Sequence, residues 1–219
     1  MRYTPYIVVG GSRRREIALT FDDGPGPFTL RVLRSLRRLR APATFFQVGQ
    51  SIPTFGSAAR AELRERYPIG DHTENHVPLA EFGLSDQRGQ VLKAAAAIQG
   101  YGAPFPRLFR PPFRSFNRTT LALMRRLHML MVLWTVDPSD YLRPPPATIV
   151  RRVLAAARPG AIVLLHDAGG IRTETIAALP RLVHGLRRRG YRLVTIARLL
   201  LDDPPPRGQP LTPPPGPGR

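Results

Sequence analysis

The sequence contains no cysteine, and Lys93 is its only lysine. The absence of cysteine excludes disulfides, thiolate metal sites and a cysteine nucleophile. No stretch approaches the roughly 18 consecutive apolar residues of a membrane-spanning helix, and the apolar segment near the N-terminus is too short for a signal peptide. If the protein is exported, we expect its leader to lie outside this sequence. Any metal site must use histidine and carboxylate ligands.

Acidic residues are also scarce. The chain has 33 lysine and arginine residues against 15 aspartate and glutamate residues, a formal net charge of +18. Such a charge draws a protein to anionic polymers such as nucleic acid, teichoic acid or an acidic cell wall. The arginines are spread over helical patterns such as 30–40 and 186–192 and are not interleaved with stacking aromatic residues. We therefore expect electrostatic attraction to an anionic cell wall and no specific nucleic-acid binding.

The length of 219 residues suits one domain, which we expect to be monomeric. We expect an N-terminal extension over residues 1–15 and a domain over 16–202. Residues 203–219 are dominated by proline and glycine, cannot bury much apolar surface, and are predicted to form a disordered tail.

Short apolar runs alternate with longer stretches of helical period, which is typical of β/α units around a parallel sheet. Strands are predicted at 16–21, 43–48, 67–70, 107–109, 129–136, 161–165 and 191–196. Helices are predicted at 28–40, 56–66, 86–99, 118–127, 147–157 and 173–189. The pattern indicates an α/β fold, either an open doubly wound sheet or a barrel of about seven parallel strands.

Polar side chains recur directly after these strands. They are Asp22 and Asp23 after the first, Arg110 after the fourth, Asp137 and Asp140 after the fifth, and His166 and Asp167 after the sixth. The carboxyl ends of parallel strands emerge on one face, which carries the active site in such folds. Residues far apart in the sequence can therefore share one pocket.

His72 and His76 in GDHTENH are four residues apart, a spacing that places two imidazoles on one side of a helical turn. Asp22 or Asp23 can supply a third ligand, and such a set suits zinc, with cobalt, nickel or iron as alternatives. A surface pair explains an isolated HxxxH about as often as a metal site does.

Adjacent aspartates in extended chain point in opposite directions, so Asp22 and Asp23 cannot have the same role. One can bind a metal while the other accepts a proton from a water that the metal acidifies. For an isolated DDGP, a solvated turn with an aspartate capping the next helix is the commoner explanation.

His166 ends the most apolar strand, where Leu164 faces the same side as its ring. A histidine there can donate a proton if a carboxylate fixes its tautomer, and Asp137 or Asp140 is available. Arg110 precedes two prolines that stiffen its loop, although RPP alone is more often a surface turn. His128 and His184 have no carboxylate nearby in sequence and are predicted to be structural or surface residues.

In order, the motifs TFDDGP, HTENH, RPPF, DPSDY and LLHD resemble the polysaccharide deacetylase family, whose shared unit is the NodB homology domain of carbohydrate esterase family 4. The match runs from about residue 16 to residue 200. The resemblance implies a distorted (β/α) barrel and metal-dependent removal of acetyl groups from N-acetylated sugars such as those of peptidoglycan or chitin. O-acetylated xylan is a rarer substrate of the family. Such enzymes usually act outside the cytoplasm, so the resemblance favours the cell envelope or the extracellular space.

Residue by residue, the resemblance makes Asp22 the general base and Asp23, His72 and His76 the ligands of one divalent ion, most often Zn2+. It makes Arg110 the residue that holds the base, and His166 the general acid oriented by Asp140. Leu164 and Tyr141 correspond to the acetyl pocket, and Phe113 to a backbone N–H that stabilises the oxyanion.

Three residues differ from the family pattern. Phe113 replaces a frequent tyrosine, Arg114 a usual glycine, and Tyr141 a common tryptophan. None of these changes removes a ligand or a proton carrier, so we expect an active enzyme. A non-catalytic glycan-binding barrel and a basic nucleic-acid-binding protein are the competing classes.

Overall fold

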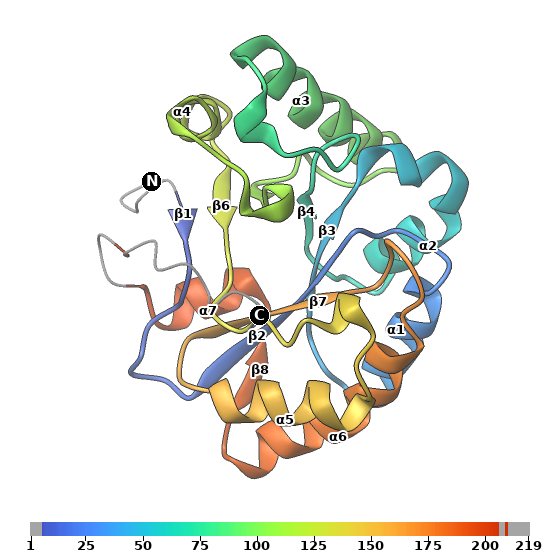
Figure 1. Ribbon diagram of the computed structural model, residues 1–219, viewed down its shortest axis with the longest axis vertical. Helices are drawn as coiled ribbons and strands as arrows, with labels where there is room; N and C mark the ends of the chain where they lie inside the picture. The colour runs from blue at the N-terminus through green and yellow to red at the C-terminus, as the bar shows by residue number, and fades with distance from the viewer. Residues whose placement is uncertain (1–5, 206–208, 210–219) are drawn as a thin grey trace.

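The computed structural model describes residues 6–205 and residue 209. Within these residues, eight short strands form one sheet surrounded by helices (Figure 1). The strands are β1 (Tyr6–Ile7), β2 (Glu16–Asp22), β3 (Thr44–Gln47), β4 (Ile69–Asp71), β5 (Leu108–Phe109), β6 (Leu130–Val132), β7 (Ala161–His166) and β8 (Arg192–Val194). The helices are α1 (Thr29–Arg38), α2 (Ile52–Arg64), α3 (Leu84–Gly100), α4 (Arg118–Arg126), α5 (Pro146–Ala156), α6 (Thr173–Arg188) and α7 (Ile196–Asp202).

All ladders of the sheet are parallel, in the order β1-β6-β5-β4-β3-β2-β7. β8 pairs with the first half of β2, and β3 pairs with its second half. A parallel bridge between Val136 and Val163 joins β7, at one end of the series, to the chain that follows β6, next to the other end. The predicted α/β barrel is confirmed, and its irregular closure accounts for the distortion.

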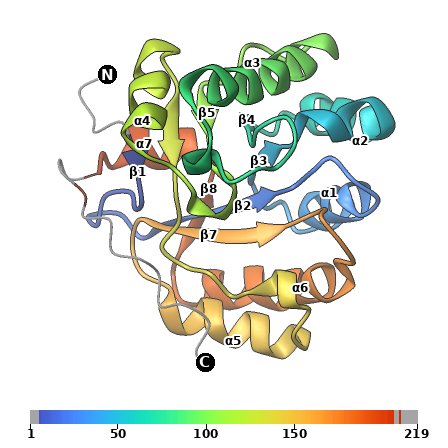
Figure 2. The ribbon, with the colours of Figure 1, turned by 45° about the horizontal axis from the view of Figure 1, so that its top comes forward.

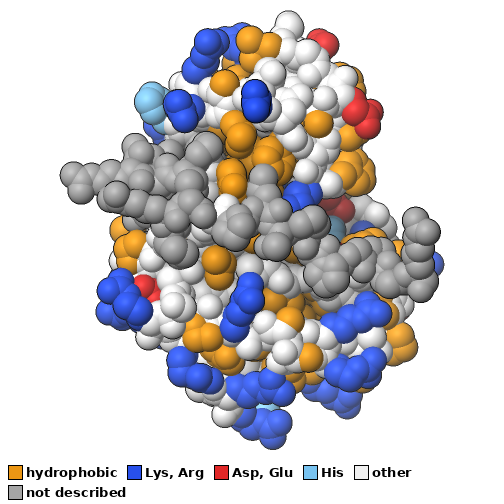
Figure 3. All heavy atoms as spheres, turned by 60° about the vertical axis from the view of Figure 1, so that its left-hand side comes forward, with side chains coloured by type: hydrophobic (Ala, Val, Ile, Leu, Met, Phe, Trp, Pro, Cys, Tyr) orange, Lys and Arg blue, Asp and Glu red, His pale blue; other side chains and the backbone are white. Residues whose placement is uncertain are grey.

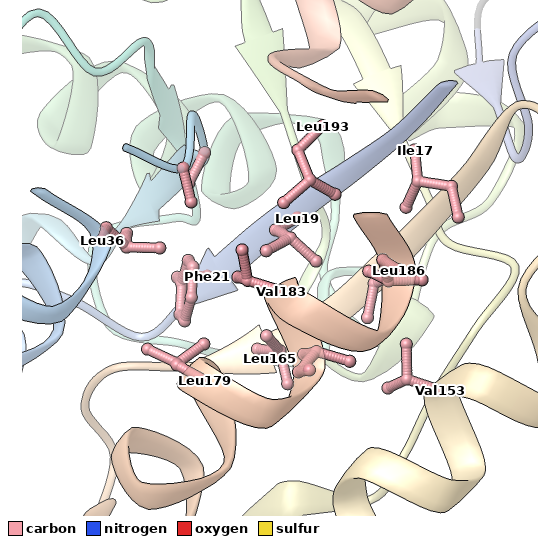
Figure 4. Packing of buried hydrophobic residues seen from close by; sticks show 14 of the residues in the cluster. Ile17, Leu19, Phe21, Leu36, Val153, Leu165, Leu179, Val183, Leu186 and Leu193 are labelled. Atoms are coloured by element: carbon pink, nitrogen blue, oxygen red, sulfur yellow. The ribbon is translucent and has the colours of Figure 1, made fainter. Parts of the chain in front are cut away.

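The largest core packs β2 and β7 against α1, α5 and α6 (Figure 4). Ile17, Leu19 and Phe21 alternate along β2 and meet Leu179, Val183 and Leu186 of α6, among others. These side chains are fully or almost fully buried, so packing against the helices holds the two strands in place. Figure 2 shows α5 and α6 together on this side of β7, and α3 and α4 on the opposite side of the barrel.

The seven predicted strands and six predicted helices are all present, with ends shifted by a few residues. The structure adds β1 and α7, and the helix begins where the last predicted strand was still expected to continue. The packed structure also extends past both expected domain boundaries. β1 pairs with β6, and the carboxylate of Asp203 accepts hydrogen bonds from the backbone N–H groups of Arg13 and Arg14. Most of the predicted tail, 206–208 and 210–219, lies outside the described residues.

The surface is more basic than the composition alone indicates, because many carboxylates lie inside. Seven of the 15 acidic residues are buried: Glu16, Asp22, Glu62, Asp71, Asp140, Asp167 and Asp203. Figure 3 shows one face on which lysine and arginine side chains are spread over a wide area and acidic side chains are few. No helix among the described residues is long and apolar enough to cross a bilayer.

Candidate active site

A cavity of about 480 Å³ opens at the carboxyl ends of the strands. Eight of the ten predicted site residues line it: Asp22, Asp23, His72, His76, Phe113, Tyr141, Leu164 and His166. The other two, Arg110 and Asp140, are fully buried behind it and contact Asp22 and His166 respectively. The structure thus brings together side chains from β2 and β7 and from the loops after β2, β4, β5 and β6.

Asp23, His72 and His76 form a group whose donor atoms all lie within 4.8 Å of one another. Oδ1 of Asp23 is 3.1 Å from Nε2 of His76 and 3.6 Å from Nε2 of His72. This oxygen is buried and accepts no hydrogen bond among the described residues, which is costly for a carboxylate. One carboxylate oxygen facing two imidazole nitrogens is a donor set that fits a divalent cation such as zinc.

Two features of the backbone differ from the sequence-based expectation. The segment that carries His72 and His76 is a loop after β4, where Thr73 and His76 have φ of 68° and 54°. This loop, rather than a helical turn, brings the two rings together. Asp23 also leaves the extended conformation, with φ of 74°. Its side chain therefore turns into the same cavity as that of Asp22, where simple strand alternation would separate them.

The orientation of His72 is fixed by a hydrogen bond to the backbone. Its Nδ1 lies 2.6 Å from the backbone carbonyl oxygen of Arg110, which can only accept, so Nδ1 carries the hydrogen. Nε2 then presents its lone pair towards the two aspartates, as metal ligation requires. Burial lowers the pKa of His72, against the opposing charges of Asp22 and Asp23, and so favours the neutral ring.

The pKa of Asp23 is lowered to about 2. Burial alone would raise it, but the interaction with His76 and the charges of His166 and His72 outweigh that effect. Asp23 is therefore ionised over the whole physiological pH range.

Asp22 ends β2 and is held by Arg110. Nη1 of Arg110 donates to Oδ1 of Asp22 at 2.6 Å and to the hydroxyl of Thr20 at 2.8 Å, while Nε donates to the carbonyl of Val132 at 2.9 Å. The guanidinium also lies 4.1 Å from the centre of the Phe46 ring. RPP is here not a surface turn, because Arg110 is completely enclosed.

His166 is held by Asp140 rather than by Asp137. Nδ1 of His166 lies 2.7 Å from Oδ1 of Asp140, whose Oδ2 accepts from the His166 backbone N–H and the Thr175 hydroxyl. Asp137 instead accepts from the backbone N–H of Ser139. Burial would lower the pKa of His166, but the charge and hydrogen bond of Asp140 raise it to about 9. The ring is therefore protonated at neutral pH, with Nε2 available as a proton donor.

Asp22 and His166 are direct partners in the ladder between β2 and β7. Both strands are buried in the main core, so the two side chains emerge side by side from a closely packed part of the barrel. The candidate base and the candidate acid thus share one cavity.

The rim is aromatic. The exposed ring of Phe113 meets His76 edge to face at 4.7 Å, and Tyr141 meets His166 in the same way at 5.5 Å. Leu164 adds an apolar wall beside His166. Arg114 lies with its guanidinium 5.7 Å from the ring of Trp134. His128 and His184, predicted to be structural or surface residues, are exposed.

Sequence reasoning missed two further residues at the site, Trp134 and Arg172, and the structural role of Asp167. Trp134 and Arg172 line the cavity. The hydroxyl of Thr29 donates to Asp167 and accepts from the backbone N–H of Gly26, which ties the DDGP turn to the end of β7. A side chain at Gly24 would come within 2.5 Å of this carboxylate, so the turn needs glycine there. Burial, above all, raises the pKa of Asp167 to about 7.

Comparison with known proteins places the chain in a family. The family model for polysaccharide deacetylase matches residues 10–132. A peptidoglycan-N-acetylglucosamine deacetylase of Bacillus cereus is 36% identical over 187 residues, covering 84% of this chain and 87% of the relative. A chitooligosaccharide deacetylase of Bradyrhizobium sp. is 37% identical over 202 residues, covering 86% of this chain and 92% of the relative.

The fold agrees with these sequence matches. The crystal structure of a peptidoglycan N-acetylglucosamine deacetylase in complex with a naphthyl benzamide superposes with a TM-score of 0.87 at 30% identity, covering 90% of this chain and 93% of that one. The sequence matches and the fold agree. The chain belongs to the polysaccharide deacetylase family.

Proposed function

We propose that this protein is a metal-dependent hydrolase that removes acetyl groups from N-acetylglucosamine units of peptidoglycan or of a chitin-like polymer. The observation that carries the proposal is the convergence of Asp23, His72 and His76 beside Asp22, with the His166–Asp140 pair in the same cavity. The names of the two relatives supply the substrate class.

Asp23, His72 and His76 would hold the metal, which we propose to be Zn2+, with Co2+ or another divalent ion as alternatives. When bound, a divalent ion at this position acidifies water and polarises a carbonyl group. Asp22 accepts the proton of the attacking water, and Arg110 keeps its carboxylate oriented. The acetyl methyl group lies between Leu164 and Tyr141.

Attack of the water oxygen on the acetyl carbon gives a tetrahedral oxyanion, which the backbone N–H of Phe113 helps to stabilise. One well-placed donor of this kind contributes roughly 3–4 kcal/mol to transition-state stabilisation in related chemistry. The carbon–nitrogen bond then breaks, and Nε2 of His166 donates the proton that the sugar nitrogen needs to leave as an amine. The products are acetate and a glucosamine unit, and the proton taken up by Asp22 returns to solvent.

An O-acetyl esterase acting on xylan-type sugars is the second candidate on the same geometry. The state of His166 favours the amide substrate, because a ring with a pKa of about 9 stays protonated at neutral pH. An amine is a poor leaving group without a proton, whereas a sugar alcohol depends on one less. A non-catalytic glycan-binding barrel would have no use for the His166–Asp140 pair or for Asp22 beside the triad.

Acetate release from chitooligosaccharides and from peptidoglycan, measured with and without a chelator, tests the proposal. Release that stops with chelator and returns with Zn2+ is expected. Release from acetylated xylan alone would favour the esterase, and binding without release would favour the glycan-binding barrel. Salt-sensitive binding of DNA or RNA with no acetate from any glycan would identify a nucleic-acid-binding protein.

The polymers concerned lie outside the cytoplasm, so we place the protein's action in the cell envelope or the extracellular space. The basic surface would add electrostatic attraction to an anionic cell wall. We expect the protein to act as a monomer.

A further inference from the structure

Arg172 is a cation in the wall of the active-site cavity that the reaction as described does not use. It lies in the turn between β7 and α6, directly before Thr173, where α6 begins (labelled in Figure 1). The side chain lines the cavity with Tyr141, Leu164 and His166. Only 3% of the residue is exposed, so its charge is largely removed from water.

The hydrogen bonds of Arg172 go to backbone carbonyl groups. Nε donates to Ala168 at 2.6 Å, and Nη1 donates to Ile171 at 3.1 Å and more weakly to Tyr141 at 3.5 Å. Within the described residues, no carboxylate oxygen lies within 4.0 Å of the guanidinium. The equally buried Arg110, in contrast, has Asp22 at 2.6 Å.

One nitrogen of the guanidinium, Nη2, is not used in these hydrogen bonds. Nη2 makes no hydrogen bond within the described residues, and it is not among the polar atoms sealed from solvent. Its N–H donors are therefore accessible to solvent, in a residue that lines the cavity. A buried charge is costly unless it is paired, and a charge-assisted hydrogen bond in such a site is stronger than one in open water. A ligand carboxylate would provide the missing partner.

The position of Arg172 indicates which part of the substrate it meets. Nη1 reaches the carbonyl of Tyr141, whose ring packs on His166. Arg172 thus lies on the side from which His166 would donate its proton to the departing sugar. We propose that Nη2 of Arg172 binds a carboxylate carried by a sugar next to the reacting N-acetyl sugar, and that the enzyme therefore prefers anionic glycans. This inference rests on the proposed function and narrows its substrate class.

A purely structural explanation of Arg172 makes a different prediction. Its bonds to Ala168, Ile171 and Tyr141 also tie the turn after β7 to the loop that carries Asp140. If that were its only role, its removal would harm every substrate equally. The ratio of activities on two substrates that differ only in charge separates the two roles.

The test uses the zinc-loaded full chain and a peptidoglycan-derived tetrasaccharide whose alternate sugars carry a free lactyl carboxylate. The second substrate is the same tetrasaccharide with each carboxylate converted to its methyl amide. The specificity ratio, kcat/KM for the carboxylate over kcat/KM for the amide, is expected to be about tenfold in favour of the carboxylate, mainly through KM. It is expected to fall towards one in Arg172→Gln and to stay intermediate in Arg172→Lys. Added salt should lower it in the unaltered protein.

Arg34→Gln is the matched control, because it removes the same charge from the exposed face of α1, outside the cavity. It should leave the ratio unchanged. A ratio of one in the unaltered protein, an unchanged ratio in Arg172→Gln, or an equal fall in Arg34→Gln would each overturn the inference while leaving deacetylation intact. Absence of acetate from both substrates and from chitooligosaccharides would overturn the proposed function, and the inference with it.

Discussion

Nη1 of Arg110 lies 2.6 Å from Oδ1 of Asp22, and both side chains are enclosed in the barrel. The pair joins the loop after β5 to the end of β2, so two segments 88 residues apart in the chain are tied beneath the candidate metal centre. The stability of the fold and the orientation of the candidate base therefore depend on the same contact.

Replacement of Arg110 by methionine should destabilise the protein strongly. The substitution leaves the carboxylate of Asp22 buried without its counter-charge, which costs about 3 kcal/mol or more in comparable cases. Urea unfolding followed by circular dichroism measures the change. Arg34→Met, on the exposed face of α1, should shift the free energy of unfolding by less than about 0.5 kcal/mol. Equal stability of the two variants would show that the Arg110–Asp22 pair contributes little.

Asp22→Asn should lower kcat by about 10²- to 10⁴-fold while leaving the metal in place, because asparagine keeps the hydrogen bond from Arg110 but cannot accept a proton. Acetate release and metal content by mass spectrometry are measured on the same preparation. Loss of the metal instead would mean that Asp22 is a ligand and that Asp23 is the base.

His72→Ala should lose metal and activity together. The substitution removes one of the three candidate ligands and leaves only Asp23 and His76 to hold the ion. Dialysis followed by metal analysis reports the loss. His128→Ala provides a control, because His128 is exposed and is not part of the triad. A metal content in His72→Ala equal to that of the control would remove His72 from the ligand set.

The activity should fall on the alkaline side as His166 loses its proton. Its pKa in the fold is raised from 6.5 to about 9, so the donor form is complete at neutral pH and is lost as pH rises towards 9. A bound cation would repel the protonated ring, lower the pKa of His166, and so move the fall in activity to lower pH. Asp140→Asn removes the main cause of the raised pKa and should move the alkaline limb of kcat/KM to lower pH.

The pH profiles of kcat/KM for the two proteins are compared in the same set of buffers. The same linkage acts on stability, because the stabilising contribution of protonated His166 is complete below about pH 6.5 and is lost as pH rises through about 9. An alkaline limb at the same pH in both proteins would show that another group sets it.

Much of the barrel was predictable because its buried strands are short apolar runs with helical stretches between them. β1 was not, since two residues give no periodicity, and only the ladder with β6 makes Tyr6–Ile7 a strand. α7 was missed because its first residues continue the apolar run of β8. Local sequence carries no signal for a contact that only the complete fold creates.

Strand ends and motif spacing predicted which side chains meet at the site. They did not predict the backbone conformation that orients those side chains. The left-handed conformations of Asp23 and His76 are not visible in the sequence, and they replace both the alternation and the helical turn that were expected. The choice of Asp140 over Asp137 depends on the turn at Ser139. Arg172 could not be identified from the sequence, because only the fold shows that it is buried in the cavity wall without a carboxylate partner among the described residues.

The ladder between β2 and β7 has a consequence for how such an enzyme can diversify. Because Asp22 and His166 are paired directly across the ladder, their separation is set by the spacing of paired strands, about 4.8 Å between backbones. The loops that bear Phe113, Tyr141 and Arg172 are outside that ladder. Changes in those loops can alter which polymer is accepted while the distance between the candidate base and the candidate acid stays constant.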